Sequence, residues 1–159
     1  MKIIVASDTH GSNSYLIRAL KEAGPVDWLL FAGDGERDLN QIGKKFPGLQ
    51  IRAVAGNCDS YPVSPWEQLL EFGGKRLFLT HGHRYGVKRD LLRLILKGRE
   101  IGADLIVFGH THLPVISQEA GMLLLNPGSL SAYARKPSYG WIEIKPDSIS
   151  PEIKYIQPV

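Results

Sequence analysis

The sequence predicts an α/β protein with mixed β-sheets, because its hydrophobic pattern changes partway along the chain. In the first third, short apolar or β-branched runs alternate with stretches whose apolar residues recur at helical spacing. Farther on, short apolar runs follow one another with turn residues between them. Strand–helix–strand units build parallel pairs and hairpins build antiparallel pairs, so both kinds of pairing are expected.

The N-terminal part of the chain is expected to contain three buried strands and two helices. The apolar runs at residues 3–6, 28–32 and 51–55 each end in a polar or glycine-containing segment, as buried parallel strands do. The amphipathic stretches at residues 14–23 and 39–46 lie between them, and each is followed by a Pro/Gly pair that ends a helix.

The rest of the chain is expected to hold a hairpin, one more helix and further strands. Gly73-Gly74 separates two apolar runs as a two-residue hairpin turn does. A leucine-rich stretch with interspersed charges predicts a surface helix over residues 87–101. The expected strands are residues 69–72, 76–80, 105–108, 115–118, 123–126, 140–144 and 153–156, the last four of them antiparallel.

Length and composition predict one domain over residues 1–159, with 43% hydrophobic residues to supply its core. The net charge of +3 is too small by itself to indicate a nucleic-acid partner, and no apolar run is long enough for a membrane span or a signal peptide. The single cysteine, Cys58, points to a reducing compartment. We therefore expect a cytoplasmic protein without a stable nucleic-acid or membrane complex. A homo-oligomer stays open, with Trp66 or Tyr133 as interface candidates.

All five histidines lie in three short segments, each directly after a predicted strand. The segments are Asp8-Thr9-His10-Gly11, His81-Gly82-His83 and Gly109-His110-Thr111-His112. Sites in open α/β sheets form beyond the carboxyl ends of strands. Residues two apart on an extended segment point to the same side, so His10 is expected to share a centre with Asp8, and His110 with His112.

Two further donors, Asp34 and Asn57, end strands next to glycines and complete a nitrogen and oxygen ligand set. Taken singly, these residues could be loop histidines or turn formers that hydrogen-bond to one another. Their joint position after strands favours a metal site, and seven donors suit two ions that share a carboxylate. Such a set suits Mn, Fe, Zn, Ni or Co. The candidates are Asp8, His10, Asp34, Asn57, His81, His110 and His112.

These segments resemble the motifs of the calcineurin-like metallophosphoesterases in order and spacing. The matching motifs are Asp8-x-His10, Gly33-Asp34, Gly56-Asn57-x-Asp59, His81-Gly82-His83 and Gly109-His110-x-His112. Asn126-Pro127-Gly128-Ser129 further resembles the small single-domain prokaryotic phosphodiesterases, the YfcE-like branch, which includes the eukaryotic retromer scaffold subunit. The resemblance implies a four-layer α-β-β-α sandwich, in which two mixed β-sheets lie face to face with helices outside.

The resemblance also implies two divalent ions and distributes their ligands. Asp8, His10, Asp34 and His112 would hold the first ion, and Asp34, Asn57, His81 and His110 the second. Manganese is the expected ion, and Ni, Zn, Fe, Co or Mg are alternatives. The charge balance predicts that a hydroxide bridging the two ions attacks the phosphoester directly. The sequence offers no better nucleophile, because no positioned base is identifiable for Ser7, Ser12 or Ser129.

Cys58 stands where many family members carry a histidine that protonates the leaving group. A thiol with a pKa of about 8.5 is a poor replacement, so esters with good leaving groups such as nitrophenolate are expected to be favoured. The catalytic candidates around this position are Cys58, Asp59 and His83. Asp59 would orient the loop or a water, or serve only as a turn carboxylate. Arg84 and Arg135 are candidate substrate contacts, with a solvated surface role as the alternative.

The leading functional hypothesis is a metal-dependent phosphodiesterase for small or nucleotide-like phosphodiesters. A phosphomonoesterase or protein phosphatase with the same centre is the first alternative, and the lack of long insertions for a peptide groove disfavours it. A catalytically weak scaffold like the retromer subunit is the second, and the complete set of seven donors disfavours it. A nuclease is the third, and the chain leaves no room for an added DNA-binding domain.

Overall fold

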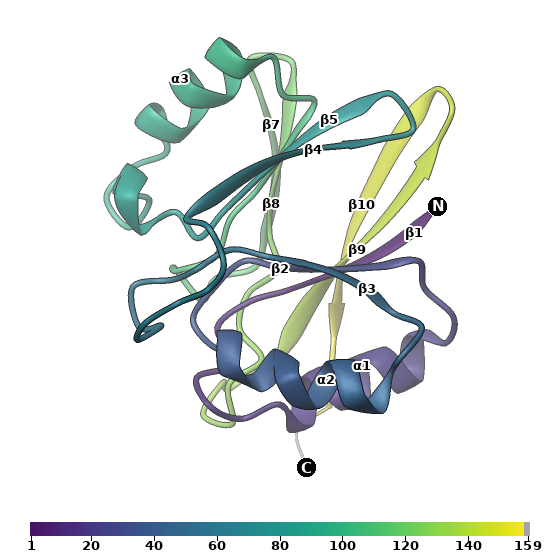
Figure 1. The fold of residues 1–159 in the computed structure, drawn as a ribbon. Coiled ribbons are helices and arrows are strands. Elements are labelled where there is room, and N and C mark those ends of the chain that lie inside the picture. Colours follow the sequence, from purple (N-terminus) through teal and green to yellow (C-terminus); the bar gives the residue numbers. More distant parts are fainter. Residues whose placement is uncertain (158–159) are drawn as a thin grey trace.

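The computed structural model describes residues 1–157 as two stacked β-sheets with helices on their outer faces (Figure 1). In chain order the elements are β1 (Lys2–Ala6), α1 (Ser14–Ala23), β2 (Trp28–Phe31), the 3₁₀ helix η1 (Glu36–Asp38), α2 (Leu39–Lys45), β3 (Gln50–Ala53), β4 (Glu67–Phe72), β5 (Lys75–Thr80), η2 (His83–Tyr85), α3 (Leu92–Ile101), β6 (Leu105–Val107), β7 (Val115–Glu119), β8 (Met122–Asn126), β9 (Ser138–Lys145) and β10 (Ser148–Tyr155).

Both sheets contain five strands and mix parallel with antiparallel pairs. The first has the order β10-β9-β1-β2-β3, in which β1, β2 and β3 run parallel and β9 runs antiparallel to β1 and β10. The second has the order β4-β5-β6-β8-β7, in which β5, β6 and β8 run parallel and the edge strands β4 and β7 run antiparallel to their neighbours. The predicted α/β sandwich with two mixed sheets is confirmed.

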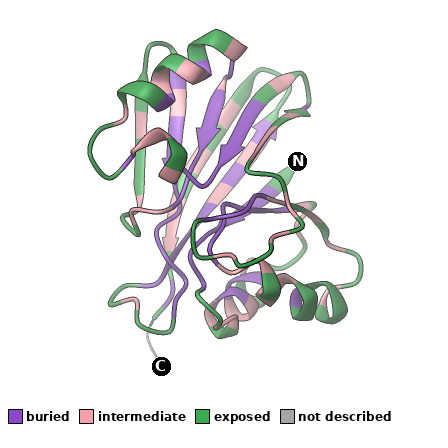
Figure 2. Ribbon diagram, turned by 60° about the vertical axis from the view of Figure 1, so that its left-hand side comes forward, coloured by how far each residue is buried: buried purple, intermediate pink, exposed green. Residues whose placement is uncertain are grey.

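Alternation of side chains along the central strands creates three hydrophobic layers. On β1, Ile3 and Val5 belong to the cluster between the two sheets, whereas Ile4 and Ala6 pack with residues of α1 and α2. The strands of the second sheet alternate in the same way, with a third cluster beneath α3. Both faces of these strands are therefore buried (Figure 2), which explains why they form continuous apolar runs in the sequence.

The helices cover the two outer faces through narrow apolar stripes. Leu16, Ala19 and Leu20 of α1 are buried against the first sheet. Leu94 of α3 is buried against the second sheet. Gly98 of the same helix lies so close to this sheet that an added Cβ would be 2.9 Å from the sulfur of Met122 on β8. Within residues 1–157, no helix is long and apolar enough to cross a membrane.

Two expectations for the C-terminal half need correction. Strand β8 was expected in an antiparallel set, yet it pairs antiparallel only with β7 and runs parallel to β6. The reason is that β7 lies at the sheet edge. The chain reverses after β7, and β8 then lies between β7 and β6 and runs in the direction of β6. The helix expected over residues 87–101 begins at Leu92, because Gly86 adopts φ +67° and its carbonyl accepts the amide of Arg89 in a turn.

Burial of Leu79 between the sheets gives a prediction for stability. Leu79 on β5 is fully buried, whereas Leu69 on the paired strand β4 is 45% exposed. Leu79→Ala should lower the free energy of unfolding in urea by about 2–5 kcal/mol, because it leaves a cavity in the central layer. Leu69→Ala should lower it by less than about 1 kcal/mol. Equal losses in the two variants would contradict this assignment of the core.

Candidate metal centre

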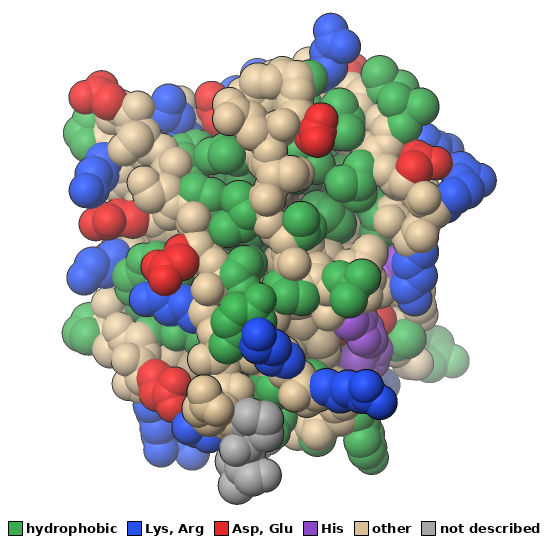
Figure 3. All heavy atoms as spheres, turned by 180° about the vertical axis from the view of Figure 1, so that it is seen from behind, with side chains coloured by type: hydrophobic (Ala, Val, Ile, Leu, Met, Phe, Trp, Pro, Cys, Tyr) green, Lys and Arg blue, Asp and Glu red, His purple; other side chains and the backbone are tan. Residues whose placement is uncertain are grey.

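The predicted ligands gather where the parallel strands of both sheets end, and histidines reach the surface there (Figure 3). Three sets of donors have ligand atoms within 4.8 Å of one another, and one of them joins His10 and Asp34 with the thiol of Cys58. The other two consist of predicted ligands and are the two donor groups of the site. The first group consists of Asp8, His10 and His112, and the second of Asp34, His81 and His110. Asn57 adjoins the second group, because its Oδ1 lies 3.1 Å from Nε2 of His81.

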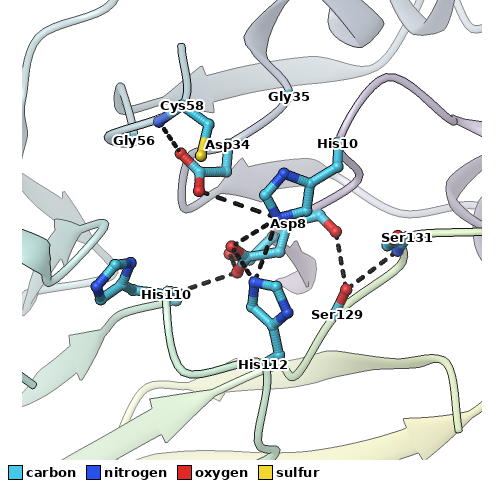
Figure 4. A network of polar contacts seen from close by, with 12 residues as sticks. Asp8, His10, Asp34, Gly35, Gly56, Cys58, His110, His112, Ser129 and Ser131 are labelled. Atoms are coloured by element: carbon cyan, nitrogen blue, oxygen red, sulfur yellow. Dashed lines mark hydrogen bonds and ion pairs between the residues drawn. The ribbon is translucent and has the colours of Figure 1, made fainter. Parts of the chain in front are cut away.

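The first group surrounds a buried oxygen that lacks a hydrogen bond. Within the described part of the chain, Oδ1 of Asp8 has no hydrogen-bond partner although the residue is fully buried. Nε2 of His112 lies 3.1 Å from this oxygen and Nε2 of His10 lies 3.6 Å from it (Figure 4). The two ring nitrogens also face each other at 3.2 Å. Three donors that converge on one point in this way fit a cation between them.

Asp34 lies between the two groups. Its Oδ2 is 3.3 Å from Nε2 of His81 and 3.9 Å from Nε2 of His10, so one carboxylate faces donors of both groups. Its Oδ1 accepts the amide of Cys58 at 2.8 Å, which fixes the orientation of the carboxylate. The Asp34 carboxylate therefore faces donors of both groups in a fixed orientation.

His110 and His112 fall in different donor groups, as in the distribution that the family resemblance implies and unlike the common centre that the extended-segment argument allowed. His112 belongs to the first group and His110 to the second. The expectation assumed an extended segment, but both residues adopt left-handed backbone conformations, with φ of +68° and +60°. The two imidazoles lie in neighbouring donor groups. Asp8 and His10 do share a centre, although their backbone is left-handed as well.

Left-handed backbone conformation is a common property of the ligand loops. Seven non-glycine residues of the described chain have positive φ, and five of them are predicted ligands. These five are Asp8, His10, Asp34, His110 and His112. Such conformations cost free energy in residues other than glycine and persist where surrounding contacts hold them.

Hydrogen bonds hold the ligands in these orientations. Nδ1 of His81 donates to the carbonyl of Ala32 at 2.6 Å, which turns Nε2 toward Oδ2 of Asp34 and Oδ1 of Asn57. The other oxygen of Asp8, Oδ2, accepts the amide of His110 at 3.1 Å and the hydroxyl of Ser7. Because Asp8 and Ala32 come from the first sheet and the histidines from the second, these bonds also join the two sheets.

The charges within the site keep both carboxylates ionised. Burial opposes ionisation of Asp34, but its hydrogen bond and attraction to His81 outweigh burial and lower its pKa to about 2. Burial likewise opposes ionisation of Asp8, while contact with His10 and His112 holds its pKa below the usual range. Burial and the charge of His81 lower the pKa of His110 to about 4, so this imidazole is neutral and able to bind a metal.

Asp59 organises two ligand loops. Its two oxygens accept the amides of Asp34, Gly35, Glu36 and Gly56 at 2.8–2.9 Å. Four amide donors occupy both oxygens, so Asp59 orients the loop, which is one of the roles expected for it. The motif that carries Asn57 thereby also fixes the turn that carries Asp34.

Sequence reasoning did not assign the supporting roles of Asp38, Asn126 and Ser129. Oδ2 of Asp38 accepts the hydroxyl of Thr9 at 2.5 Å and the amide of Gly11 at 3.1 Å, on either side of His10. Ser129 donates its hydroxyl to the carbonyl of Asp8 at 2.8 Å. Asn126 donates to the carbonyl of Gly109 at 2.9 Å and to the hydroxyl of Thr111 at 3.0 Å, next to the last two histidines. The Asn-Pro-Gly-Ser motif was the available signal for two of these roles.

Cys58 and His83, two of the catalytic candidates, lie beside the donor groups. Burial and a hydrogen bond with Asp34 raise the pKa of the Cys58 thiol, so it holds its proton more tightly than a free thiol. The His83 ring lies 5.3 Å from that of His81, and its Nδ1 is buried without a partner among the described residues. The His83 ring therefore lies beside the second donor group, and the thiol of Cys58 is a poor proton donor.

The two substrate-binding candidates occupy different surroundings. Arg84 is exposed, and its guanidinium lies over the ring of Trp66, 5.9 Å from the centroid. Arg135 lines a groove that begins at His10 and His112. The structure therefore brings Arg135, but not Arg84, into a cavity with the first donor group.

Comparison with known proteins identifies the class to which this fold and site belong. Residues 1–147 match the calcineurin-like phosphoesterase superfamily domain. The chain is 34% identical over 152 residues to the probable metallophosphoesterase YsnB of Bacillus subtilis, which covers 93% of this chain and 87% of the relative. It is also 34% identical over 175 residues to the phosphodiesterase YfcE of Escherichia coli, which covers 90% of this chain and 88% of the relative. The chain belongs to the calcineurin-like phosphoesterase superfamily.

Solved structures agree with this assignment. A predicted phosphoesterase from Streptococcus pneumoniae superposes with a TM-score of 0.81 at 31% identity and covers 97% of this chain and 88% of its own. Vps29 of Entamoeba histolytica, crystallised with zinc, superposes with a TM-score of 0.79 and 98% coverage of each chain. Its identity is 21%, so this second likeness concerns the fold alone.

The four amides on Asp59 give a prediction about metal loading. Asp59→Ala should lower the free energy of unfolding by roughly 2–4 kcal/mol, because buried donors lose a charged acceptor. It should also reduce the metal that the purified protein retains, since the turn bearing Asp34 is released. Urea unfolding and elemental analysis measure the two effects, with the exposed Asp147→Ala as control. Unchanged stability together with unchanged metal content would contradict the organising role of Asp59.

Proposed function

We propose that the chain is a phosphodiesterase with two divalent metal ions, one held by each donor group. Asp8, His10, Asp34 and His112 hold the first ion, and Asp34, Asn57, His81 and His110 hold the second. The observation that carries the proposal is the position of Asp34, whose Oδ2 faces Nε2 of both His10 and His81. The buried Oδ1 of Asp8, which has no hydrogen-bond partner among the described residues, supports the proposal independently.

The charges of the site explain why it needs cations and suits an anionic ester. Asp8 and Asp34 remain ionised and almost fully buried, so without cations the site would repel phosphate. Two bound divalent ions supply an activated water and neutralise the phosphoryl oxygens. His83 lies beside the second group and is assigned a contact with the bound ester. Because Cys58 retains its proton, the chain favours esters whose leaving group needs little protonation.

A diester is favoured over a monoester because the site is open on two sides of His10. A groove of 570 Å³ and a pocket of 320 Å³ both include this histidine, so each has room for one substituent of the phosphate. The relative YfcE is called a phosphodiesterase, in agreement with this choice. A phosphomonoester would leave one of the two spaces without a substituent.

Manganese is the ion that we assign first, since the nitrogen and oxygen donors include no required thiolate. Zinc is the principal alternative, because Vps29 of Entamoeba histolytica was crystallised with it. A reducing cytoplasmic location suits the single exposed cysteine. A scaffold function, as in the retromer subunit, is less well supported, since the donor sets around both centres are complete.

Hydrolysis assays with an Asp34 variant test this function. After removal of metal and reloading with Mn²⁺, the protein should hydrolyse bis-para-nitrophenyl phosphate faster than para-nitrophenyl phosphate. Asp34→Asn should lower kcat/KM for the diester by about 100-fold or more, because it removes a charge that both ions share. The exposed Asp147→Asn should leave kcat/KM unchanged. A preference for the monoester would favour a phosphatase, and metal binding without turnover of either ester would favour a scaffold.

A further inference from the structure

A groove extends from the first donor group along the loop that follows β8. It has a volume of 570 Å³ and begins at His10 and His112. The loop at residues 129–136 forms one wall, Leu113 and Pro114 form another, and Tyr155 at the end of β10 closes it. We refer to this cavity as the aromatic groove. Its volume lies within the range of small-molecule binding sites.

Aromatic and aliphatic side chains line the aromatic groove and are unusually exposed. Tyr133 is 93% exposed, Leu113 is 69% exposed and Tyr155 is 47% exposed. Large apolar side chains gathered beside a polar centre indicate a binding surface rather than ordinary protein exterior. The most exposed of the three, Tyr133, presents a free ring face to any molecule that enters the groove.

The aromatic groove is positively charged. Arg135 and Lys136 line it, and among the described residues no acidic side chain does. The ammonium of Lys136 lies 4.2 Å from the centroid of the Tyr155 ring, so it fixes that ring in place. Lys and Arg side chains accordingly lie next to the visible histidines in Figure 3.

The pocket on the other side of His10 has the opposite character. Its 320 Å³ are lined by the carboxylates of Asp34, Glu36, Asp38 and Asp59 together with a single arginine. This acidic lining disfavours an anionic substituent. The two sides of the centre therefore differ in charge and in aromatic content, so they select different substituents of one diester.

A chain of hydrogen bonds connects the aromatic groove to the first donor group. Ser129 donates its hydroxyl to the carbonyl of Asp8 at 2.8 Å, and the amide of Ser131 donates to the Ser129 hydroxyl at 3.1 Å (Figure 4). The amide of Tyr133 then donates to the hydroxyl of Ser131 at 3.2 Å. Because these bonds run from a ligand residue to Tyr133, the loop is held in place relative to the centre before a ligand binds.

We infer that the aromatic groove binds the nucleoside arm of a nucleotide-type phosphodiester whose phosphate lies at the centre. The inference rests on the proposed function and specifies its substrate class. Tyr133 stacks on the base, because its ring is free and base–aromatic stacking tolerates any base. Arg135 attracts the anionic backbone of the nucleotide. Leu113 and Pro114 exclude water from the other face of the arm.

Calorimetric titration of the Mn²⁺-loaded protein with two anions tests the inference. Thymidine 5′-phosphate probes the centre and the groove together, whereas inorganic phosphate probes the centre alone. We expect thymidine 5′-phosphate to bind at least about tenfold more tightly than inorganic phosphate. Tyr133→Ala should weaken the binding of thymidine 5′-phosphate about tenfold, because stacking acts on the base. The same variant should leave the affinity for inorganic phosphate unchanged. Tyr133→Phe keeps an aromatic ring, so its affinity for thymidine 5′-phosphate should stay within about twofold of that of the unaltered protein.

Tyr61→Ala is the matched control, since Tyr61 is 95% exposed and does not line the aromatic groove. It should change neither affinity. Three results overturn the inference: thymidine 5′-phosphate binding no more tightly than phosphate, Tyr133→Ala weakening neither anion or both equally, or Tyr61→Ala causing the loss instead.

Failure of the proposed function has a different signature. If the protein binds thymidine 5′-phosphate through Tyr133 but hydrolyses no diester, the proposed function is refuted and the inference about the aromatic groove stands. If the protein hydrolyses bis-para-nitrophenyl phosphate but Tyr133→Ala does not change its affinity for thymidine 5′-phosphate, the proposed function stands and the inference about the aromatic groove is overturned. Absence of binding by either anion overturns the inference outright.

Discussion

The burial of two ionised carboxylates, Asp8 and Asp34, determines how the two sheets meet. Both side chains are at most 2% exposed, and both retain their charge. A buried carboxylate costs several kcal/mol unless opposite charge and hydrogen bonds compensate it. The compensation comes from both sheets: His10 and the Cys58 amide belong to the first, and His112, His81 and the His110 amide belong to the second. The charge that the site needs for metal binding is therefore also what joins the sheets along this edge.

The backbone around these carboxylates is strained so that short loops can direct several donors inward. A left-handed conformation costs about 1–3 kcal/mol in a residue other than glycine, and five predicted ligands adopt it. Contacts outside the donor set hold these conformations, and the four amides on Asp59 and the bond from Ser129 to Asp8 are the clearest examples. A rigid set of ligands results, in which the donors face one another before any ion binds. Gly109 completes the arrangement, since an added Cβ would lie 2.9 Å from Oδ2 of Asp8.

Much of this architecture could be predicted from the sequence, because burial and chemistry leave local patterns. The central strands are buried on both faces and therefore form continuous apolar runs, and polar residues beside glycine mark their ends. Spacing alone did not decide which histidines lie together, whereas the family resemblance implied the grouping of His112 with His10 and of His110 with His81 that the structure has. The direction of β8 depends on the position of β7 at the sheet edge, which is a property of the whole sheet. A loop-orienting role for Asp59 was expected, but its four partners could not be named, because they lie in two loops that the sequence separates.

The central claim is that Asp34 connects two metal ions at one site, and electron paramagnetic resonance of the Mn²⁺-loaded protein tests it most directly. Metal content and spectrum should be measured on the same sample. The account predicts two ions per chain, with a spectrum that shows spin coupling between them. In Asp34→Asn this coupling should disappear along with part of the metal. One ion per chain, or two ions with uncoupled spectra in the unaltered protein, would contradict the shared carboxylate and with it the two-metal site.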